Sequence, residues 1–240
     1  MSRKIAMLAL VIAVAFAKAL TAQSTVVELF TSQGCSSCPP ADELLAEVQE
    51  QYGDDVITLS YHVDYWDYIG WKDPFASQAI TQKQYAYATA FRSRQVYTPQ
   101  AVINGNSHFT GSDQRKMNLA LQSNTLKNSN PIALGKVKST GNKYFADYTI
   151  ANPGTAESVT FVLTLKSRTT AIKRGENRNK TLTNHNIVID QVTVDIQKEG
   201  SIQLSKPAWV SPEDELAIVA YVTKNNVGIT SATRKPLVSP

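Results

Sequence analysis

The sequence has few cysteines, few histidines and no long apolar stretch after Ala22. Its 240 residues include two cysteines and three histidines, and no second Cys or His pair stands at the close spacing that zinc ligands need. Low-complexity tracts are also missing. With 42% hydrophobic and 18% charged residues, the chain is neither disordered nor collagen-like. The sequence therefore predicts a folded protein without a structural zinc site.

Excess charge of one sign is scarce as well. The 24 Lys and Arg residues face 20 Asp and Glu residues. Three of the cations (Arg3, Lys4 and Lys18) lie in the N-terminal segment that ends at Ala22, which contains no acid. Since the remainder is close to neutral, it lacks the basic surface that nucleic-acid binding requires. We expect no nucleic-acid partner.

The N-terminal segment, residues 1–22, has the pattern of a secretory signal peptide. Arg3 and Lys4 precede an unbroken apolar run at residues 5–17. This run is shorter than the roughly 20 residues that span a bilayer, and it suits the apolar region of a signal peptide. Ala17-Lys18-Ala19 fits a cleavage site, and Ala22 offers a later one. We therefore expect removal of residues 1–22, a periplasmic or secreted mature protein, and no membrane association after cleavage.

The next part, residues 23–128, alternates strand and helix patterns. β-branched and apolar runs favour strands, whereas apolar residues at spacings of three and four favour helices. The expected elements are strands at 25–31, 56–63, 95–104 and 107–110, and helices at 39–53, from the Asp73-Pro74 cap to about 94, and at 112–127. Such alternation is typical of an α/β domain.

The last part, residues 131–240, lacks a helical pattern of useful length. Segments rich in Val, Ile, Thr and Tyr alternate with turns rich in Gly and Asn. The expected strands are 143–151, 158–166, 186–197 and 215–224. Strands without helices over this length predict an all-β antiparallel, sandwich-like domain.

The two cysteines form the motif Cys35-Ser36-Ser37-Cys38 between the first strand and the first helix. A disulfide that closes so small a loop contributes only about 2 kcal/mol of chain entropy, so a structural purpose is the weaker explanation. At a helix N-terminus, unpaired N–H groups and the helix dipole favour a thiolate at Cys35. Cys38 follows one turn later and can resolve a mixed disulfide. With alternating strands and helices around it, this motif predicts a thioredoxin-like dithiol.

Thr98 and Pro99 are expected to frame a substrate groove. They precede the third strand, where the thioredoxin fold carries a cis-proline opposite the dithiol. Cis bonds are rare even before proline, at about 5–6%, but the position of Pro99 in this order of elements outweighs that scarcity. We predict a cis peptide bond at Pro99.

A second cluster of chemistry-bearing residues follows the strand at 56–63. The carboxyl ends of parallel strands meet at one sheet edge, where ligands collect. His62 is therefore expected near Cys35, where it would tune the thiols with Asp64 orienting its ring. Trp66 and Trp71 could provide an apolar platform for substrate, or they could simply pack the loop.

Several other polar residues have two open interpretations. Glu28 precedes Cys35 by seven residues and so lies on the opposite strand face; we expect it to be partly exposed or paired rather than a proton acceptor for the thiols. The clusters at residues 174–177 and 184–186 could face the dithiol, or could serve as turn and cap residues.

With these motifs in view, the chain resembles the DUF1223 family of exported bacterial proteins, which is assigned to the thioredoxin-like superfamily. The matching stretches are residues 26–42 (VVELFTSQGCSSCPPAD), 61–75 (YHVDYWDYIGWKDPF), 97–105 (YTPQAVING) and 174–188 (RGENRNKTLTNHNIV). The resemblance implies an α/β thioredoxin-like domain with a C-x-x-C motif, followed by a β-rich domain. It supplies no substrate.

The sequence thus predicts an exported thiol–disulfide oxidoreductase without a cofactor. Cys35 would attack and Cys38 resolve, and the substrate would be an exported protein or a small thiol or disulfide. One alternative is a copper metallochaperone that uses Cys35, Cys38 and His62 as a soft thiolate–imidazole site. The other is a non-catalytic binding protein with an inert disulfide, in which the β-rich domain does the work.

Overall fold

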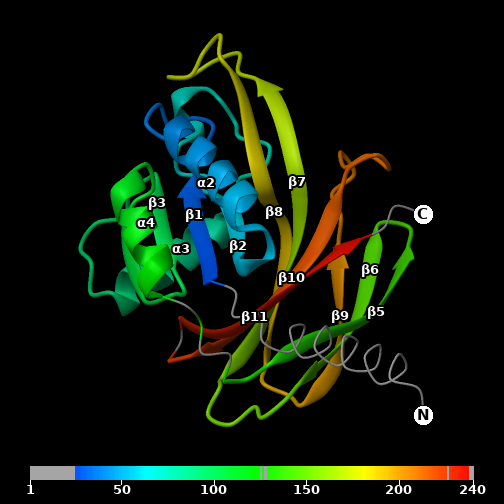
Figure 1. The fold of residues 1–240 in the computed structure, drawn as a ribbon. Coiled ribbons are helices and arrows are strands. Elements are labelled where there is room, and N and C mark those ends of the chain that lie inside the picture. Colours follow the sequence, from blue (N-terminus) through cyan, green and yellow to red (C-terminus); the bar gives the residue numbers. More distant parts are fainter. Residues whose placement is uncertain (1–24, 125, 127–128, 226, 238–240) are drawn as a thin grey trace, which may run out of the picture.

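The computed structural model describes residues 25–237 except 125, 127–128 and 226 (Figure 1). The expected signal peptide lies outside these residues. The described chain is a mixed α/β protein with three α-helices, a large sheet of eight strands and a small sheet of three. None of the described helices is long and apolar enough to cross a membrane.

The first half of the chain follows the predicted alternation closely. Its strands are β1 (Thr25–Thr31), β2 (Val56–His62), β3 (Gln100–Ile103) and β4 (Ser107–Thr110), and its helices are α2 (Pro39–Tyr52), α3 (Gln78–Ala90) and α4 (Gln114–Ser123). Two short 3₁₀ turns, η1 (Gly53–Asp55) and η2 (Asp67–Ile69), follow α2 and β2. β1 and β2 run parallel, with Thr31 opposite His62. Their carboxyl ends therefore meet at one edge, as predicted.

The expected start of α3 is wrong. Asp73 does not cap the helix; Ser77 does, and its hydroxyl oxygen accepts a hydrogen bond from the backbone N–H of Ile80. The helix begins at Gln78 because the carboxylate of Asp73 is engaged by other partners, described below. The segment between β2 and α3 is consequently a long connection that lies beside the dithiol.

The second half contributes only strands among the described residues. They are β5 (Ile132–Thr140), β6 (Lys143–Ile150), β7 (Ser158–Ala171), β8 (Thr181–Asp195), β9 (Glu199–Ser205), β10 (Leu216–Lys224) and β11 (Gly228–Leu237). The sequence patterns did not identify β5, β9 and β11. These strands are largely polar or half-exposed, so they lack the apolar signal of a buried strand.

The two halves share the large sheet. Its strand order is β11-β10-β7-β8-β2-β1-β3-β4, and the junction between halves is a bridge of Ser60 in β2 with Ile187 in β8. The expected domain division near residue 130 thus separates segments of sequence, but not two sheets. Figure 1 shows the long β7–β8 hairpin rising beside α2, past the carboxyl end of β1.

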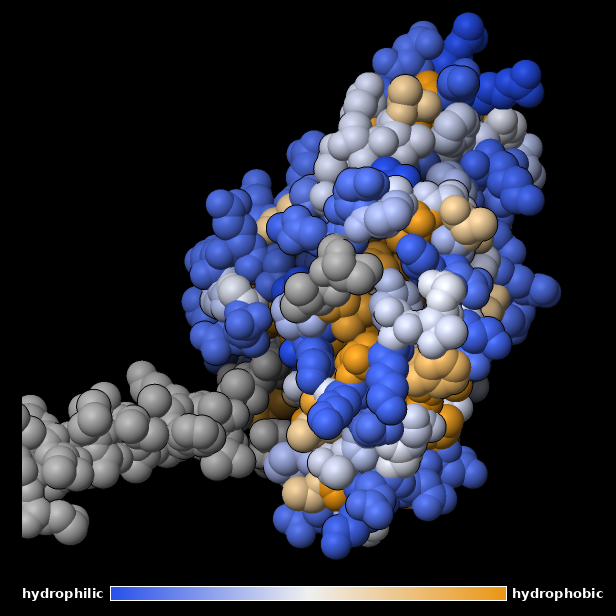
Figure 2. Space-filling model, turned by 90° about the vertical axis from the view of Figure 1, so that its right-hand side faces the viewer, coloured by the Kyte–Doolittle hydropathy of each residue, from blue (hydrophilic) through white to orange (hydrophobic). Residues whose placement is uncertain are grey.

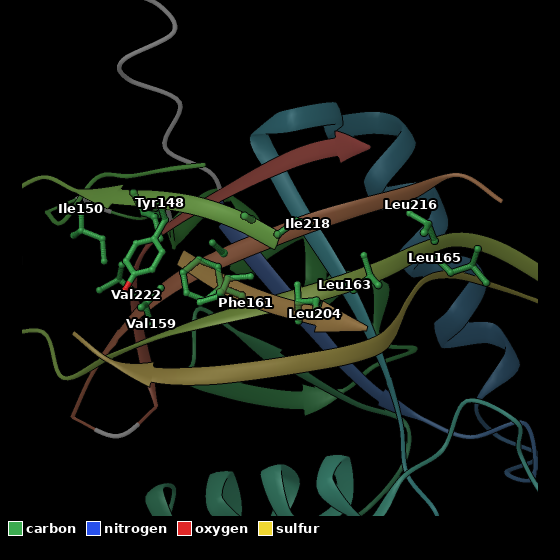
Figure 3. Close-up of a cluster of buried hydrophobic side chains, with 14 of the residues drawn as sticks. Tyr148, Ile150, Val159, Phe161, Leu163, Leu165, Leu204, Leu216, Ile218 and Val222 are labelled. Carbon is green, nitrogen blue, oxygen red and sulfur yellow. The ribbon is translucent and has the colours of Figure 1, made fainter. Parts of the chain in front are cut away.

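Apolar side chains fill three buried clusters. One lies between α2, α4 and the first-half strands, and a second involves α3 and the opposite face of those strands. The third packs β5, β6 and β9 against β7 and β10 around Tyr148, Phe161 and Ile218 (Figure 3). On the face shown in Figure 2, hydrophilic side chains cover most of the surface around a central apolar band. The second cluster contains residues of β1 and β2 together with residues of β7 and β8, so it packs the two halves of the chain against each other.

Candidate functional site

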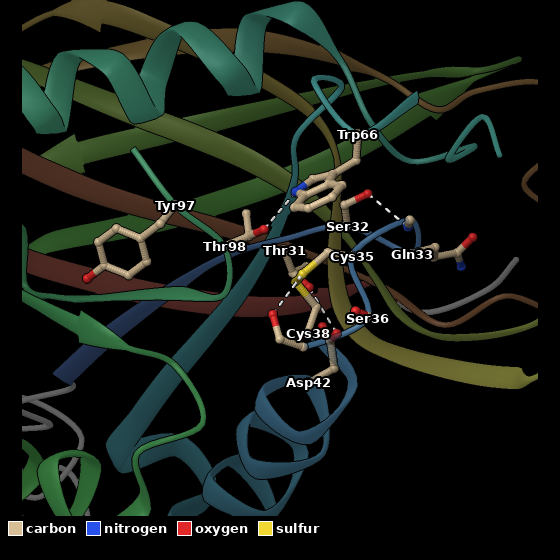
Figure 4. The surroundings of a disulfide bond; sticks show 12 residues. Thr31, Ser32, Gln33, Cys35, Ser36, Cys38, Asp42, Trp66, Tyr97 and Thr98 are labelled. Atoms are coloured by element: carbon tan, nitrogen blue, oxygen red, sulfur yellow. Dashed lines mark hydrogen bonds between the residues drawn. A yellow bond between two sulfur atoms is a disulfide. The ribbon is translucent and has the colours of Figure 1, made fainter. Parts of the chain in front are cut away.

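Cys35 and Cys38 form a disulfide in the loop between β1 and α2 (Figure 4). Cys38 is the N-cap residue of α2, and its carbonyl accepts hydrogen bonds from the N–H groups of Ala41 and Asp42. Both cysteines are 0% exposed. The motif therefore lies at a helix N-terminus, as predicted, but the sulfurs are covered in this oxidised form.

A buried carboxyl lies one turn into α2. Asp42 is 5% exposed, and its Oδ2 accepts a 2.9 Å hydrogen bond from the hydroxyl of Thr31 (Figure 4). Burial raises the pKa of Asp42 to about 6, although the charge of His62 and hydrogen bonds from Thr31 and Asn184 act in the opposite direction. Among the described residues Asp42 forms no ion pair. Figure 4 shows Asp42 close to the disulfide, on the helix that Cys38 caps.

Sequence reasoning missed the burial of Asp42, because an acid in the first turn of a helix is ordinarily a partner of the helix dipole. A signal was available. Asp42 directly follows Ala41 and precedes Leu45 by three residues, so it borders the apolar stripe of the helix. A carboxyl on that border is buried when the helix packs.

His62 is 0% exposed and lies at the end of β2. Its Nδ1 is 2.7 Å from Oδ2 of Asp73, and its Nε2 is 3.2 Å from the hydroxyl of Ser60. Burial alone would lower the pKa of His62, but the charge and the hydrogen bond of Asp73 raise it above the ordinary value. Burial alone would raise the pKa of Asp73. The charge of His62 and the backbone N–H donors of Gln33 and Phe75 outweigh this effect, and the pKa is lowered below its ordinary value.

The predicted pairing of His62 with Asp64 is wrong. Asp64 accepts a 2.6 Å hydrogen bond from the hydroxyl of Thr81 in α3, and Asp73 orients the imidazole instead. Asp73 also accepts a 2.8 Å hydrogen bond from the N–H of Gln33 in the dithiol loop. The pair His62–Asp73 therefore supports the loop that carries Cys35.

The ligands of the copper alternative are not brought together. Both ring nitrogens of His62 are engaged by Asp73 and Ser60. Within residues 25–237, apart from the omitted positions, no group of three or more His, Cys, Asp or Glu side chains is placed to hold a metal ion. His62 therefore does not complete a site with the two cysteines.

The peptide bond between Thr98 and Pro99 is cis, as predicted. The hydroxyl of Thr98 accepts a 2.8 Å hydrogen bond from the indole N–H of Trp66, and Figure 4 shows both side chains beside the disulfide. The indole N–H of Trp71 donates to Oε1 of Gln33 at 3.1 Å. Both tryptophans are half-buried. Hydrogen bonds anchor Trp66 to Thr98 and Trp71 to the dithiol loop, so the two indoles do not form a free platform.

The β7–β8 turn contacts the dithiol loop directly. The side-chain amide of Asn177 donates to the carbonyls of Gln33 and Cys35, both at 2.9 Å. Glu176 accepts a 3.0 Å hydrogen bond from the N–H of Ser36. These contacts confirm that the cluster at residues 174–177 faces the dithiol.

The second polar cluster reaches the same loop through one residue. Oδ1 of Asn184 accepts a 2.9 Å hydrogen bond from the side chain of Gln33, whereas the amide of Asn186 donates to the hydroxyl of Thr58. The imidazole of His185 lines a groove between α2 and β8, and partial burial lowers its pKa. Only the first residue of this cluster therefore joins the site.

Glu28 lies on the opposite strand face, as predicted. It is fully buried rather than partly exposed, and it is paired with Lys83 at 3.0 Å and bonded by the hydroxyl of Tyr87. The ammonium of Lys83 also lies 5.1–5.3 Å from the ring centres of three tyrosines (Tyr61, Tyr87 and Tyr221). This cluster ties α3 and β10 to the central strands, away from the disulfide.

Comparisons with known proteins identify the family. A family model described as "Protein of unknown function (DUF1223)" matches residues 26–223. A crystal structure of a protein from Agrobacterium tumefaciens is 32% identical, with a TM-score of 0.66 over 88% of this chain and 92% of that one.

Other solved structures are much less similar. OgpA from Akkermansia muciniphila is 10% identical and covers 44% of this chain and 27% of its own, with a TM-score of 0.24. The human F-spondin reeler domain is 9% identical and covers 45% and 88%, with a TM-score of 0.22. Neither supports an argument about this fold, and no curated protein matches. The family model spans most of the chain, and the chain therefore belongs to the DUF1223 family.

Proposed function

We propose that this protein is an exported thiol–disulfide oxidoreductase whose first half is thioredoxin-like. Support comes from the order of its parts: a first strand, the C-x-x-C motif, a helix whose N-cap is the second cysteine, a parallel second strand, and a cis-proline before β3. Export is proposed from the leader pattern of residues 1–22. The substrate would be an exported protein or a small thiol or disulfide.

The observation that carries the proposal is the buried carboxyl of Asp42. Burial of an ionisable group without an ion pair costs stability, and a structural bridge needs no such group beside it. A dithiol that reacts does need one, because the thiol of Cys38 must lose a proton before it can attack. A carboxyl with a pKa of about 6 is matched to proton exchange near neutral pH.

The proposed thiol–disulfide exchange uses only Cys35, Cys38, Asp42 and the substrate disulfide. In the reducing direction, the Cys35 thiolate attacks a substrate disulfide, forms a mixed disulfide and releases one substrate thiolate. Cys38 passes its proton to Asp42, and its thiolate attacks the sulfur of Cys35. The mixed disulfide breaks, the second substrate thiolate leaves, and the protein disulfide forms as two electrons pass to the substrate. The oxidising direction is the reverse.

Access to Cys35 requires local movement. The sulfurs are covered in the oxidised form, the indole of Trp66 lies beside the disulfide (Figure 4), and Asn177 of the β7–β8 turn is hydrogen-bonded to the carbonyl of Cys35. We propose that Trp66 swings away from Thr98 when a substrate enters. This movement would expose Thr98 and the cis-proline to the substrate backbone.

The burial of both cysteine sulfurs also supports a second candidate function. A non-catalytic binding protein would keep an inert disulfide covered, and its Cys35→Ser variant would bind its partner unchanged. The two candidates differ in the reactivity of the reduced protein. Only an oxidoreductase has one cysteine that attacks and another that resolves.

Trapping of a mixed disulfide tests the proposal. The reduced Cys38→Ser variant is mixed with a peptide disulfide and followed by intact-protein mass spectrometry, with Cys35→Ser as the matched control. We expect Cys38→Ser to accumulate a stable adduct, because it can attack but cannot resolve, whereas Cys35→Ser reacts much more slowly. Equal, slow reaction of both variants would contradict the proposal and favour the inert disulfide.

A further inference from the structure

The turn that joins β7 and β8, residues 172–180, is strongly basic. Four of its nine residues are exposed cations: Lys173, Arg174, Arg178 and Lys180. None of them forms an ion pair among the described residues. The single acid in the turn, Glu176, is bonded to the N–H of Ser36. The turn therefore presents positive charge that is not neutralised by salt bridges.

This charge is unusual for the chain as a whole. The body after the leader is close to neutral, so four cations in one turn stand out from it. The hairpin tip lies at the top of the molecule in Figure 1, and the same region is among the most hydrophilic in Figure 2. A shallow surface hollow there is lined by Ile69, Lys173, Arg174, Gly175, Glu176 and Arg178. The hollow offers room for an anionic group.

The basic turn is fixed next to the dithiol. The side-chain amide of Asn177 donates a 2.9 Å hydrogen bond to the carbonyl of Cys35. Within the turn, the backbone N–H of Arg178 donates to the carbonyl of Gly175, and that of Asn179 donates to the carbonyl of Ile172. Gly175 has a φ of +75°, and a Cβ there would lie 3.3 Å from Cβ of Trp71. The close packing of this glycine fixes the backbone of the turn against the connection between β2 and α3, which carries Trp71.

The charged side chains of a turn that contacts the dithiol loop act on a substrate that approaches this loop. Ionic screening in a physiological buffer extends over roughly 8 Å, and Asn177, which touches Cys35, is flanked in sequence by Arg178. Clustered charge of one sign beside a reactive group raises the encounter rate of oppositely charged substrates by about tenfold or more. The same field repels cationic substrates.

We infer that the β7–β8 turn selects disulfide and thiol substrates that carry carboxylates beside the reacting sulfur. The inference rests on the proposed function, since it names the substrate class of the same dithiol. Two sources supply this chemistry, namely small carboxylated thiols and acidic segments of exported proteins. The cations orient the carboxylates, and Cys35 exchanges with the adjacent sulfur.

The test compares substrates that differ in charge. The reduced protein is mixed with dithiodipropionate (anionic), hydroxyethyl disulfide (neutral) and cystamine (cationic), and formation of the Cys35–Cys38 disulfide with release of two probe thiols is timed. Each rate is divided by that of the same probe with mercaptoethanol, which removes differences in intrinsic reactivity. A second arm uses disulfide peptides with Glu or Lys beside the cysteine.

The charge variant is Arg174→Glu/Arg178→Glu, and the matched control is Lys136→Glu/Lys138→Glu, which makes the same charge change at exposed positions of β5. We expect the wild type and the control to favour the anionic probe over the cationic one by about tenfold at low salt. The ratio should fall toward one in high salt and in the charge variant.

Each outcome has a separate meaning. A preference in the peptide arm alone would support the inference and identify acidic protein segments as the source. Equal normalised rates for all charges in both arms, with measurable exchange of the neutral probe, would overturn the inference and leave the oxidoreductase proposal intact. Absence of exchange with every probe and peptide would overturn both.

Discussion

Replacement of Asp42 by asparagine should stabilise the oxidised protein in a pH-dependent way. The pKa of Asp42 rises from 3.8 to about 6 on folding, which corresponds to about 3 kcal/mol at about 1.4 kcal/mol per tenfold change in the proton equilibrium. Because the folded state binds the proton more tightly, wild-type stability falls as the pH rises from about 4 through 6. The asparagine side chain carries no charge and retains an oxygen that can accept from Thr31.

Urea denaturation at pH 4, 5, 6 and 7 measures this effect. The free energy of unfolding of Asp42→Asn minus that of the wild type should be smallest at pH 4 and should increase by about 2.4 kcal/mol toward pH 7, because Asp42 in the unfolded chain is already more than half ionised at pH 4. The control Asp147→Asn, which removes an exposed carboxylate from β6, should show no such rise. A difference for Asp42→Asn that stays constant from pH 4 to pH 7 would refute the reasoning.

Three further predictions concern other contacts. Lys83→Met leaves the buried carboxylate of Glu28 without its ion pair and should lower the free energy of unfolding by about 3–5 kcal/mol in urea; a change below about 1 kcal/mol would contradict this. Trp66→Phe removes an indole N–H bond worth about 1 kcal/mol, so dithiothreitol should reduce the disulfide about fivefold faster; an unchanged rate would argue against Trp66 as a cover. Glu176→Gln removes a negative charge beside the loop, so the pKa of Cys35 in the reduced protein should fall in pH-dependent alkylation; a rise would exclude this influence.

Local patterns were sufficient for the elements around the cysteines. The strand at Thr25–Thr31 and the helix behind Pro39 follow from short-range rules of β-branching and helical periodicity, whereas the cis bond at Pro99 was predicted from the order of elements in the thioredoxin fold. The predicted position of the dithiol at a helix N-terminus depends only on the end of the first strand, the break at Gly34 and the helical signals that follow Cys38. These features could be predicted because they are determined locally.

The partners of the site residues could not be predicted in the same way. Asp73 was expected to be a helix cap because Asp before Pro is a common N-terminal signal, yet it bonds Gln33, which lies 40 residues away. Asn177 lies 142 residues from Cys35. Contacts at such separations depend on how the β7–β8 hairpin crosses the first half of the chain, and a single sequence carries no periodic signal of that crossing.

The shared sheet was missed for a related reason. β8 joins β2 at Ser60 and Ile187, and both strands are buried at that point. A buried strand carries the same apolar pattern whether its neighbour comes from its own half of the chain or from the other. The sequence therefore indicated two sets of strands but not the pairing between them.

The reduction potential of the Cys35–Cys38 pair tests the central claim most directly. The mature protein is equilibrated in dithiothreitol buffers of graded ratio, and the oxidised fraction is measured by alkylation and mass spectrometry. For an active dithiol we predict a value between about −120 and −270 mV, the range of known oxidoreductases. A value below about −300 mV, typical of structural disulfides, would contradict the account.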